Sequence, residues 1–226
     1  MKIKRLDWDS NFFGFEIGEI ENNCDFSETE NYNLIVLKQK TERKIEIQNF
    51  KESFQETKII FNKKLESNIP NFLDNSIIDF DDKVVGKEVF YSLAFESGKF
   101  SRFKLDSNFK NQKFELLYTK WVDNSANKEF ADKIFYIKES KEVIGFVTLK
   151  KNHDFSTVGL IAISQSHQGK GLGKKLLLKV EDYCICQNIL ELRIPTQKEN
   201  LGACDFYTKM GYSIYEETII KHYWKN

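Results

Sequence analysis

The segment from residue 164 to residue 175 reads Ser-Gln-Ser-His-Gln-Gly-Lys-Gly-Leu-Gly-Lys-Lys and has the composition of an anion site. Glycine has no Cβ, so its backbone can turn tightly and approach a ligand closely. Free amides at a helix N-terminus, together with the positive end of the helix dipole, bind phosphate groups. Three glycines alternate here before an amphipathic stretch, and three lysines add counter-charge: Gly169, Gly171, Gly173, Lys170, Lys174 and Lys175. The segment is therefore a candidate diphosphate site.

Three other interpretations of this glycine segment compete with a diphosphate site. A P-loop would need glycine where Gln168 stands and Ser or Thr where Lys175 stands, so that motif is excluded. A dinucleotide fold would need Gly-x-Gly-x-x-Gly after a parallel strand, and Glu191 would lie inside the next strand instead of at its end. That interpretation stays a weaker alternative, as does an ordinary tight turn that binds nothing.

Regular elements on both sides would hold this turn in place. The pattern of apolar residues in the second half predicts, in order, a helix (114–125), three strands (133–138, 143–149 and 157–164), a helix (173–187), a strand (189–194), a helix (200–210) and an extended segment from residue 212. Short polar turns join the three strands, which predicts an antiparallel meander. The long helix should bury Leu176, Leu177, Val180 and Cys184 on one face.

The first half carries no chemical motif of comparable strength. We predict strands over residues 33–38 and 57–65, with an amphipathic helix over residues 41–54 between them. Residues 66–87 are typical of a loop-rich crossing region, and a domain boundary is expected near residues 109–113. The fold class expected for the whole chain is α/β, with a mixed sheet.

Two motifs in the second half resemble those of the GCN5-related N-acetyltransferases (GNAT). Gln168-x-x-Gly171-x-Gly173 resembles the pyrophosphate signature of that family and follows a strand, as it does there. Some forty residues later, Asn200-x-x-Ala203-x-x-Phe206-Tyr207, followed by a glycine and an aromatic residue, resembles the second signature. The likeness covers about residues 113–223, or about half of the chain.

This resemblance implies a GNAT fold in which two neighbouring strands splay apart and acetyl-CoA binds in the gap. The pantetheine arm would lie along the backbone of one strand, at Leu160, Ile161, Ala162 and Ile163. Backbone amides would hold the diphosphate at Gln168, Gly169, Lys170, Gly171, Leu172, Gly173 and Lys174. Asn200, the expected N-cap of the last helix, would contact the pantetheine arm, and Ala203 of the same signature is assigned to the cofactor site as well.

Tyr207 stands where the family places its general acid. The acceptor amine must be neutral to attack the thioester, and a phenol with a pKa of about 10 suits a departing thiolate. The alternative is that Tyr207 packs in a core stripe with Ala203, Phe206 and Met210. The sequence does not select a general base.

The N-terminal half carries a further resemblance, to one group of enzymes within this family. Residues 6–14, Leu-Asp-Trp-Asp-Ser-Asn-Phe-Phe-Gly, resemble the opening of the dTDP-fucosamine N-acetyltransferases. Those enzymes acetylate the 4-amino group of a nucleotide-linked 4-amino-4,6-dideoxyhexose and carry a non-catalytic, GNAT-like N-terminal α/β domain. The resemblance implies such a substrate-side or structural domain over residues 1–110 and a GNAT domain over residues 111–226. Arg102 would contact a substrate phosphate, with surface ion pairing as its alternative role.

Other acceptors remain open, namely a protein N-terminus, a lysine side chain or an antibiotic amine. A non-catalytic acyl-CoA-binding module is the alternative from another class.

Thirty-four basic residues balance thirty-four acidic ones, so neither a nucleic acid nor an anionic membrane is expected as a partner. The N-terminus lacks the apolar run of a signal peptide, no stretch has the length of a membrane span, and we expect a cytoplasmic protein. The four cysteines and three histidines show no metal-ligand spacing, so no metal is expected. The sequence does not fix the oligomeric state, and a homodimer is the assembly considered.

Overall fold

Three strands of the second half form the expected antiparallel meander. The computed structural model describes residues 3–21, 28–66, 74–109 and 113–226. In it, β6 (Lys133–Glu139), β7 (Glu142–Lys151) and β8 (Ser156–Ile163) pair in sequence order. The turn between β6 and β7 places Ser140 at a φ of 55°, which a short reversal of the chain requires.

The meander belongs to a sheet that contains strands from both halves of the chain. Ten described strands lie in the order β1-β2-β3-β10-β4-β9-β8-β7-β6-β5. The long β4 (Phe50–Lys64) pairs antiparallel with β10 (Ser213–Lys225) on one side and with β9 (Glu191–Gln197) on the other. The remaining strands are β1 (Lys4–Arg5), β2 (Ile17–Glu21), β3 (Leu34–Gln39) and β5 (Ile77–Asp79). The expected α/β class with a mixed sheet is confirmed, since β2–β3 and β8–β9 are parallel pairs.

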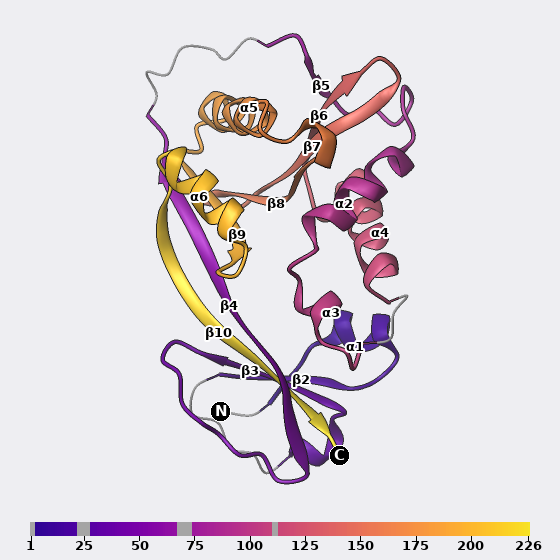
Figure 1. Cartoon of the computed structure of the whole chain (residues 1–226), viewed down its shortest axis with the longest axis vertical. Coiled ribbons are helices and arrows are strands. Elements are labelled where there is room, and N and C mark those ends of the chain that lie inside the picture. The colour runs from indigo at the N-terminus through magenta and orange to yellow at the C-terminus, as the bar shows by residue number, and fades with distance from the viewer. Residues whose placement is uncertain (1–2, 22–27, 67–73, 110–112) are drawn as a thin grey trace.

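Helices cover both faces of this sheet (Figure 1). One face carries α5 (Leu172–Cys186) and α6 (Leu201–Lys209). The other carries α1 (Asp7–Phe13), α2 (Tyr91–Ser97), α3 (Arg102–Leu105) and α4 (Lys113–Ala126). Short 3₁₀ turns are η1 (Thr29–Asn31), η2 (Lys87–Phe90) and η3 (Gln165–His167).

The alternation of apolar residues along the strands divides the core between the two faces. In β6, Ile134 and Tyr136 join the cluster under α2 and α4, whereas Phe135 and Ile137 join the cluster under α5. Successive strand residues point to opposite faces, which explains this division. The face of α5 predicted to be buried is confirmed, because all four of its members are fully buried: Leu176, Leu177, Val180 and Cys184.

The helix predicted over residues 41–54 is wrong, because residues 50–64 form β4 and residues 43–47 have no regular structure. The pairing of β4 with β10 shifts register between His222 and Tyr223. This shift places Phe50 and Phe54 of β4 on opposite faces of the sheet. Phe50 packs against the cluster around Tyr223, whereas the ring of Phe54 lies 5.4 Å from that of His222. The apolar spacing that suggested one helix face therefore serves two faces of a strand.

The described residues contain no helix with the length and apolarity needed to cross a membrane. The domain boundary expected near residues 109–113 includes residues 110–112, which lie outside the described residues. Because β4 lies between β10 and β9, the two halves share one sheet, and their division into domains stays a prediction.

Candidate functional site

The parallel pair β8 and β9 separates soon after it begins. Only two residue pairs join the strands, Ser156 with Leu192 and Thr157 with Arg193. Beyond them the edge of β8 that faces β9 has no strand partner, while its other edge stays paired with β7. A cleft with a volume of about 1100 Å³ occupies the gap. Its lining includes the β8 residues expected to meet the cofactor, Leu160, Ile161, Ala162 and Ile163.

The glycine turn closes one end of this cleft. Gly169 and Gly171 both have a φ of +77°, and a Cβ added at either position would meet no atom within 4 Å. Such a left-handed backbone favours glycine, and the space beside it is open. Gly171 is the N-cap of α5, so the first amides of that helix have no acceptor within it. Both glycines line the cleft, together with four further predicted residues: Gln168, Leu172, Gly173 and Lys174. Lys170 is the one predicted cofactor residue that does not line it.

The side chain of Gln168 explains how the turn is held. Its Nε2 donates a hydrogen bond to the carbonyl oxygen of Ile163, 3.2 Å away, and so ties the turn to the end of β8. Lys175, at the other end of the segment, forms an ion pair with Asp74 at 2.9 Å. Among the lysines of this turn, Lys174 is the one that lines the cleft.

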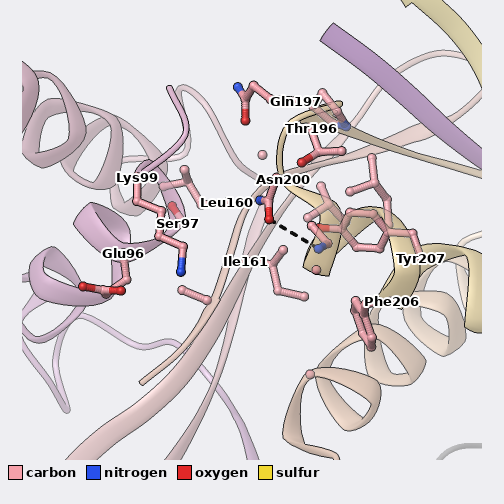
Figure 2. Close-up of a pocket in the computed structure, with 18 of the residues that line it drawn as sticks. Glu96, Ser97, Lys99, Leu160, Ile161, Thr196, Gln197, Asn200, Phe206 and Tyr207 are labelled. Atoms are coloured by element: carbon pink, nitrogen blue, oxygen red, sulfur yellow. Dashed lines mark hydrogen bonds between the residues drawn. The ribbon is translucent and has the colours of Figure 1, made fainter. Parts of the chain in front are cut away.

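Asn200 caps α6 as predicted. Its Oδ1 accepts a hydrogen bond from the backbone amide of Ala203 at 3.3 Å, the dashed line in Figure 2. Both residues line the cleft. An N-cap of this kind satisfies one of the four free amides that begin a helix. The cap fixes the start of α6 and, with it, the position of the next cleft residues along the helix.

Tyr207 is both packed and part of the cleft wall. Its side chain is buried at 4% exposure, and its ring lies 5.5 Å from that of Phe61 and 5.4 Å from that of Phe206. Figure 2 shows the ring directed toward the side of the cleft where Asn200 and Ile161 lie. Burial raises the pKa of Tyr207 above its usual value, so the phenol keeps its proton at neutral pH. The two roles weighed from the sequence are therefore compatible in geometry.

The far side of the cleft is charged and comes from the first half of the chain. Asp9 on α1, Glu56 and Lys58 on β4, and Arg102 on α3 all line it. Glu56 is 5% exposed, and its Oε1 lies 3.7 Å from Nη1 of Arg102. Burial raises the pKa of Glu56 to about 7, raises that of Asp9 and lowers that of Lys58. Burial penalises each charged form, which explains all three directions.

Of these four residues, sequence reasoning found Arg102 alone. The structure places Arg102 at the cleft and also in an ion pair, although its partner Glu56 is buried instead of on the surface. Its Nε is buried and makes no hydrogen bond to any described residue. No local motif marks Glu56 or Lys58, because the pairing of β4 with β9 and β10 brings them to the site.

Two aromatic side chains stand partly exposed at the cleft. Trp8 on α1 and Phe130 after α4 are 36% and 39% exposed, and their ring centroids are 5.9 Å apart. Exposed aromatic rings that line a cavity are suited to stack on planar rings or on the apolar face of a sugar.

Comparisons with known proteins agree with this geometry. The model of the Acetyltransferase (GNAT) family matches residues 96–212. The streptothricin acetyltransferase of Escherichia coli is 24% identical over 138 residues, which are 58% of this chain and 79% of that protein. The spore coat polysaccharide biosynthesis protein SpsD of Bacillus subtilis is 25% identical over 137 residues. Those residues are 61% of this chain, and the match spans about half of SpsD, 47% of its length.

The fold likeness extends further than the sequence likeness. A GNAT-family protein of Novosphingobium aromaticivorans superposes with a TM-score of 0.58 at 11% identity, covering 85% of this chain and 74% of that one. At this sequence identity the match shows a shared fold and nothing about activity. The family match, which covers half of the chain, includes the splayed strands, the glycine turn and Tyr207. The chain therefore belongs to the Acetyltransferase (GNAT) family and is an N-acetyltransferase.

Proposed function

We propose that this chain binds acetyl-CoA in the cleft between β8 and β9 and transfers the acetyl group to a primary amine of a small molecule. The observation that carries the proposal is the junction of the splayed strands with the glycine turn in one cleft. The turn fits a diphosphate, because its free amides and the open space beside Gly169 and Gly171 leave room for an anion. The unpaired edge of β8 fits an extended arm that takes backbone hydrogen bonds.

In this proposal Tyr207 is the general acid. The acceptor nitrogen attacks the thioester carbonyl, the carbon–sulfur bond breaks, and the phenol gives its proton to the leaving thiolate. A neutral phenol is the form that can donate, and the raised pKa of Tyr207 maintains it. Asn200 and the backbone of residues 160–163 orient the arm, while the amides from Gln168 to Lys174 hold the diphosphate.

We propose the 4-amino group of a nucleotide-linked 4-amino-4,6-dideoxyhexose, such as dTDP-4-amino-4,6-dideoxygalactose, as the acceptor. Arg102 supplies a cation for a substrate phosphate, and Trp8 with Phe130 supplies a surface for a base or sugar ring. The likeness to a protein of spore coat polysaccharide biosynthesis also favours a sugar acceptor. In this arrangement residues 1–110 form the acceptor side, and residues 111–226 form the cofactor side.

An antibiotic amine is the second candidate acceptor. It is favoured by the likeness to streptothricin acetyltransferase, of which the chain spans 79%. The charged wall made by Asp9 and Glu56 would also suit a cationic acceptor.

A thiol-release assay with acetyl-CoA distinguishes these acceptors. The panel contains dTDP-4-amino-4,6-dideoxygalactose, streptothricin and a lysine peptide. We expect the nucleotide sugar to have the highest kcat/KM, and turnover of streptothricin alone would replace it with the antibiotic. If calorimetry with the purified chain shows no binding of CoA, the cofactor site itself is contradicted.

A further inference from the structure

One buried carboxylate in the cleft has no hydrogen-bond partner for one of its oxygens. Glu56 is 5% exposed, and its Oε2 makes no hydrogen bond to any described residue. The nearest cation, Nη1 of Arg102, is 3.7 Å from the other oxygen, which is beyond hydrogen-bond length. A carboxylate removed from water without full pairing costs free energy, and such groups gather at functional sites.

The position of Glu56 connects it with the splayed strands. On β4, Lys58 pairs with Gln197, the last residue of β9, and Glu56 lies two residues further on the same face. It therefore lies just past the end of β9, in the cleft that Tyr207 also lines.

We propose that Glu56 is the general base that removes a proton from the ammonium group of the acceptor. The inference rests on the proposed function, because it assigns a role in the acetyl transfer at the same site. Oε2 is the acceptor atom, since it makes no hydrogen bond within the part of the chain that the structure describes. Nη1 of Arg102 faces the other oxygen, Oε1, at 3.7 Å and leaves Oε2 to the acceptor.

Glu56 and Tyr207 together account for every proton that moves in the reaction. Glu56 takes one proton from R-NH3⁺, and R-NH2 forms the carbon–nitrogen bond as the carbon–sulfur bond breaks. Tyr207 protonates the thiolate, and the second proton lost from nitrogen restores the phenol. Glu56 then releases its proton to solvent, so each turnover converts R-NH3⁺ and acetyl-CoA into the amide, CoA-SH and one free proton.

The charges around Glu56 suit this cycle at neutral pH. Burial raises its pKa to about 7, and Glu199 after β9 raises it as well, while Arg102 on α3 and Lys58 on β4 lower it. From α4 the group that faces it is the phenol of Tyr118, whose own pKa is raised to about 12 and which therefore stays neutral. A base with a pKa near the working pH can both accept and release a proton.

The test compares the pH profiles of kcat/KM for the wild type, Glu56→Gln and Glu56→Asp. The acceptor is the nucleotide sugar, or streptothricin if the acceptor panel shows turnover of streptothricin alone. The wild-type value should rise tenfold per pH unit below pH 7 and level off above it. Glu56→Gln should lower kcat/KM at pH 7 by about 100-fold and abolish the bend near pH 7. Glu56→Asp should keep the bend with a smaller loss. Glu52→Gln, which removes a carboxylate of the same strand outside the cleft lining, is the matched control and should change the rate less than threefold.

Three outcomes decide between the claims. CoA affinity from calorimetry should be unchanged in Glu56→Gln, because the cofactor side is intact. An active wild type whose profile lacks the bend, or a Glu56→Gln variant that keeps rate and bend, overturns the role of Glu56 and leaves the proposed function standing. A wild type that binds no CoA overturns the proposed function instead. The wild-type profile settles the matter even if a variant folds poorly.

Discussion

The side-chain amide of Gln168 donates a hydrogen bond to the carbonyl oxygen of Ile163, 3.2 Å away, and thereby fixes the glycine turn to the last residue of β8. The bond gives the side chain of Gln168 a structural role at this motif position. Its removal should loosen the turn whose amides face the cleft. We expect Gln168→Ala to weaken CoA binding by about tenfold, which is the loss of one hydrogen bond of about 1.4 kcal/mol, measured by calorimetry.

Gly171 should tolerate no side chain when CoA is bound. We expect Gly171→Val to raise the Kd for CoA by at least 100-fold, because its side chain would occupy the space that the diphosphate needs and would strain a backbone at a φ of +77°. Calorimetry and thermal unfolding measure the two effects separately.

Gly14 is the matched control for the backbone strain. It has a φ of +78° with no atom within 4 Å of an added Cβ, and it caps α1 away from the cleft lining. Gly14→Val should destabilise the fold to a similar degree and leave CoA affinity unchanged. Equal losses of affinity in the two variants would contradict a diphosphate site at Gly171.

The variant Tyr207→Phe tests whether Tyr207 is the general acid. We expect kcat to fall by about 100-fold while the Kd for CoA changes less than twofold, because the ring still fills the stripe beside Phe61 and Phe206. Stopped assays of CoA release measure the first quantity. Tyr212→Phe is the control, since its hydroxyl bonds to buried Glu181 at 2.8 Å outside the cleft lining. A variant at Tyr207 with an unchanged kcat would return this tyrosine to a packing role.

The cofactor side could be predicted because its signals are local. The cap made by Asn200 and the turn at Gly171 each depend on a few consecutive residues, and both lie where the sequence places them. The charged wall could not be predicted in this way. Asp9, Glu56 and Arg102 are far apart along the chain, and they meet because β4 is inserted between β9 and β10. Strand order and the register shift beside Phe54 are tertiary facts that no local pattern contains.

A buried ion pair under α5 should contribute strongly to stability. Glu181 is 1% exposed and accepts hydrogen bonds from Nζ of Lys63 at 2.9 Å and from the hydroxyl of Tyr212 at 2.8 Å. Lys63→Met would leave this carboxylate buried without its cation. We expect the free energy of unfolding to fall by about 3–5 kcal/mol, measured by denaturant titration.

The neighbouring lysine is the control for this pair. Lys64 has a side chain that is 77% exposed and pairs with Glu191, so Lys64→Met should cost at most about 1 kcal/mol. The double variant Lys63→Met with Glu181→Leu should recover most of the loss, because the carboxylate left without its cation is then removed as well. Equal effects of the two lysine substitutions would contradict the importance of the buried charge.

Acid should destabilise the fold through His222. This imidazole is fully buried, its Nδ1 hydrogen-bonds to Oδ2 of Asp106 at 2.7 Å, and burial lowers its pKa. Below about pH 6.5 the unfolded chain binds a proton here that the folded chain does not, so the free energy of unfolding falls as the pH decreases. Burial of Asp106 is outweighed by its hydrogen bonds from His222 and Trp224, which hold its pKa at about 2, so its own contribution is lost only as the pH falls from about 4 toward 2.

The two contributions are separated by His222→Asn, which keeps a side-chain N–H near Asp106 but cannot titrate. Between pH 7 and pH 4 we expect the free energy of unfolding of this variant to change less with pH than that of the wild type. Glu56, whose pKa is raised to about 7, changes stability in the opposite direction over the same range, so the difference between the two proteins is the quantity to compare. Denaturant titrations at four pH values measure it. If the difference is constant with pH, protonation of the buried imidazole does not govern the acid response, and the carboxylates alone must account for it.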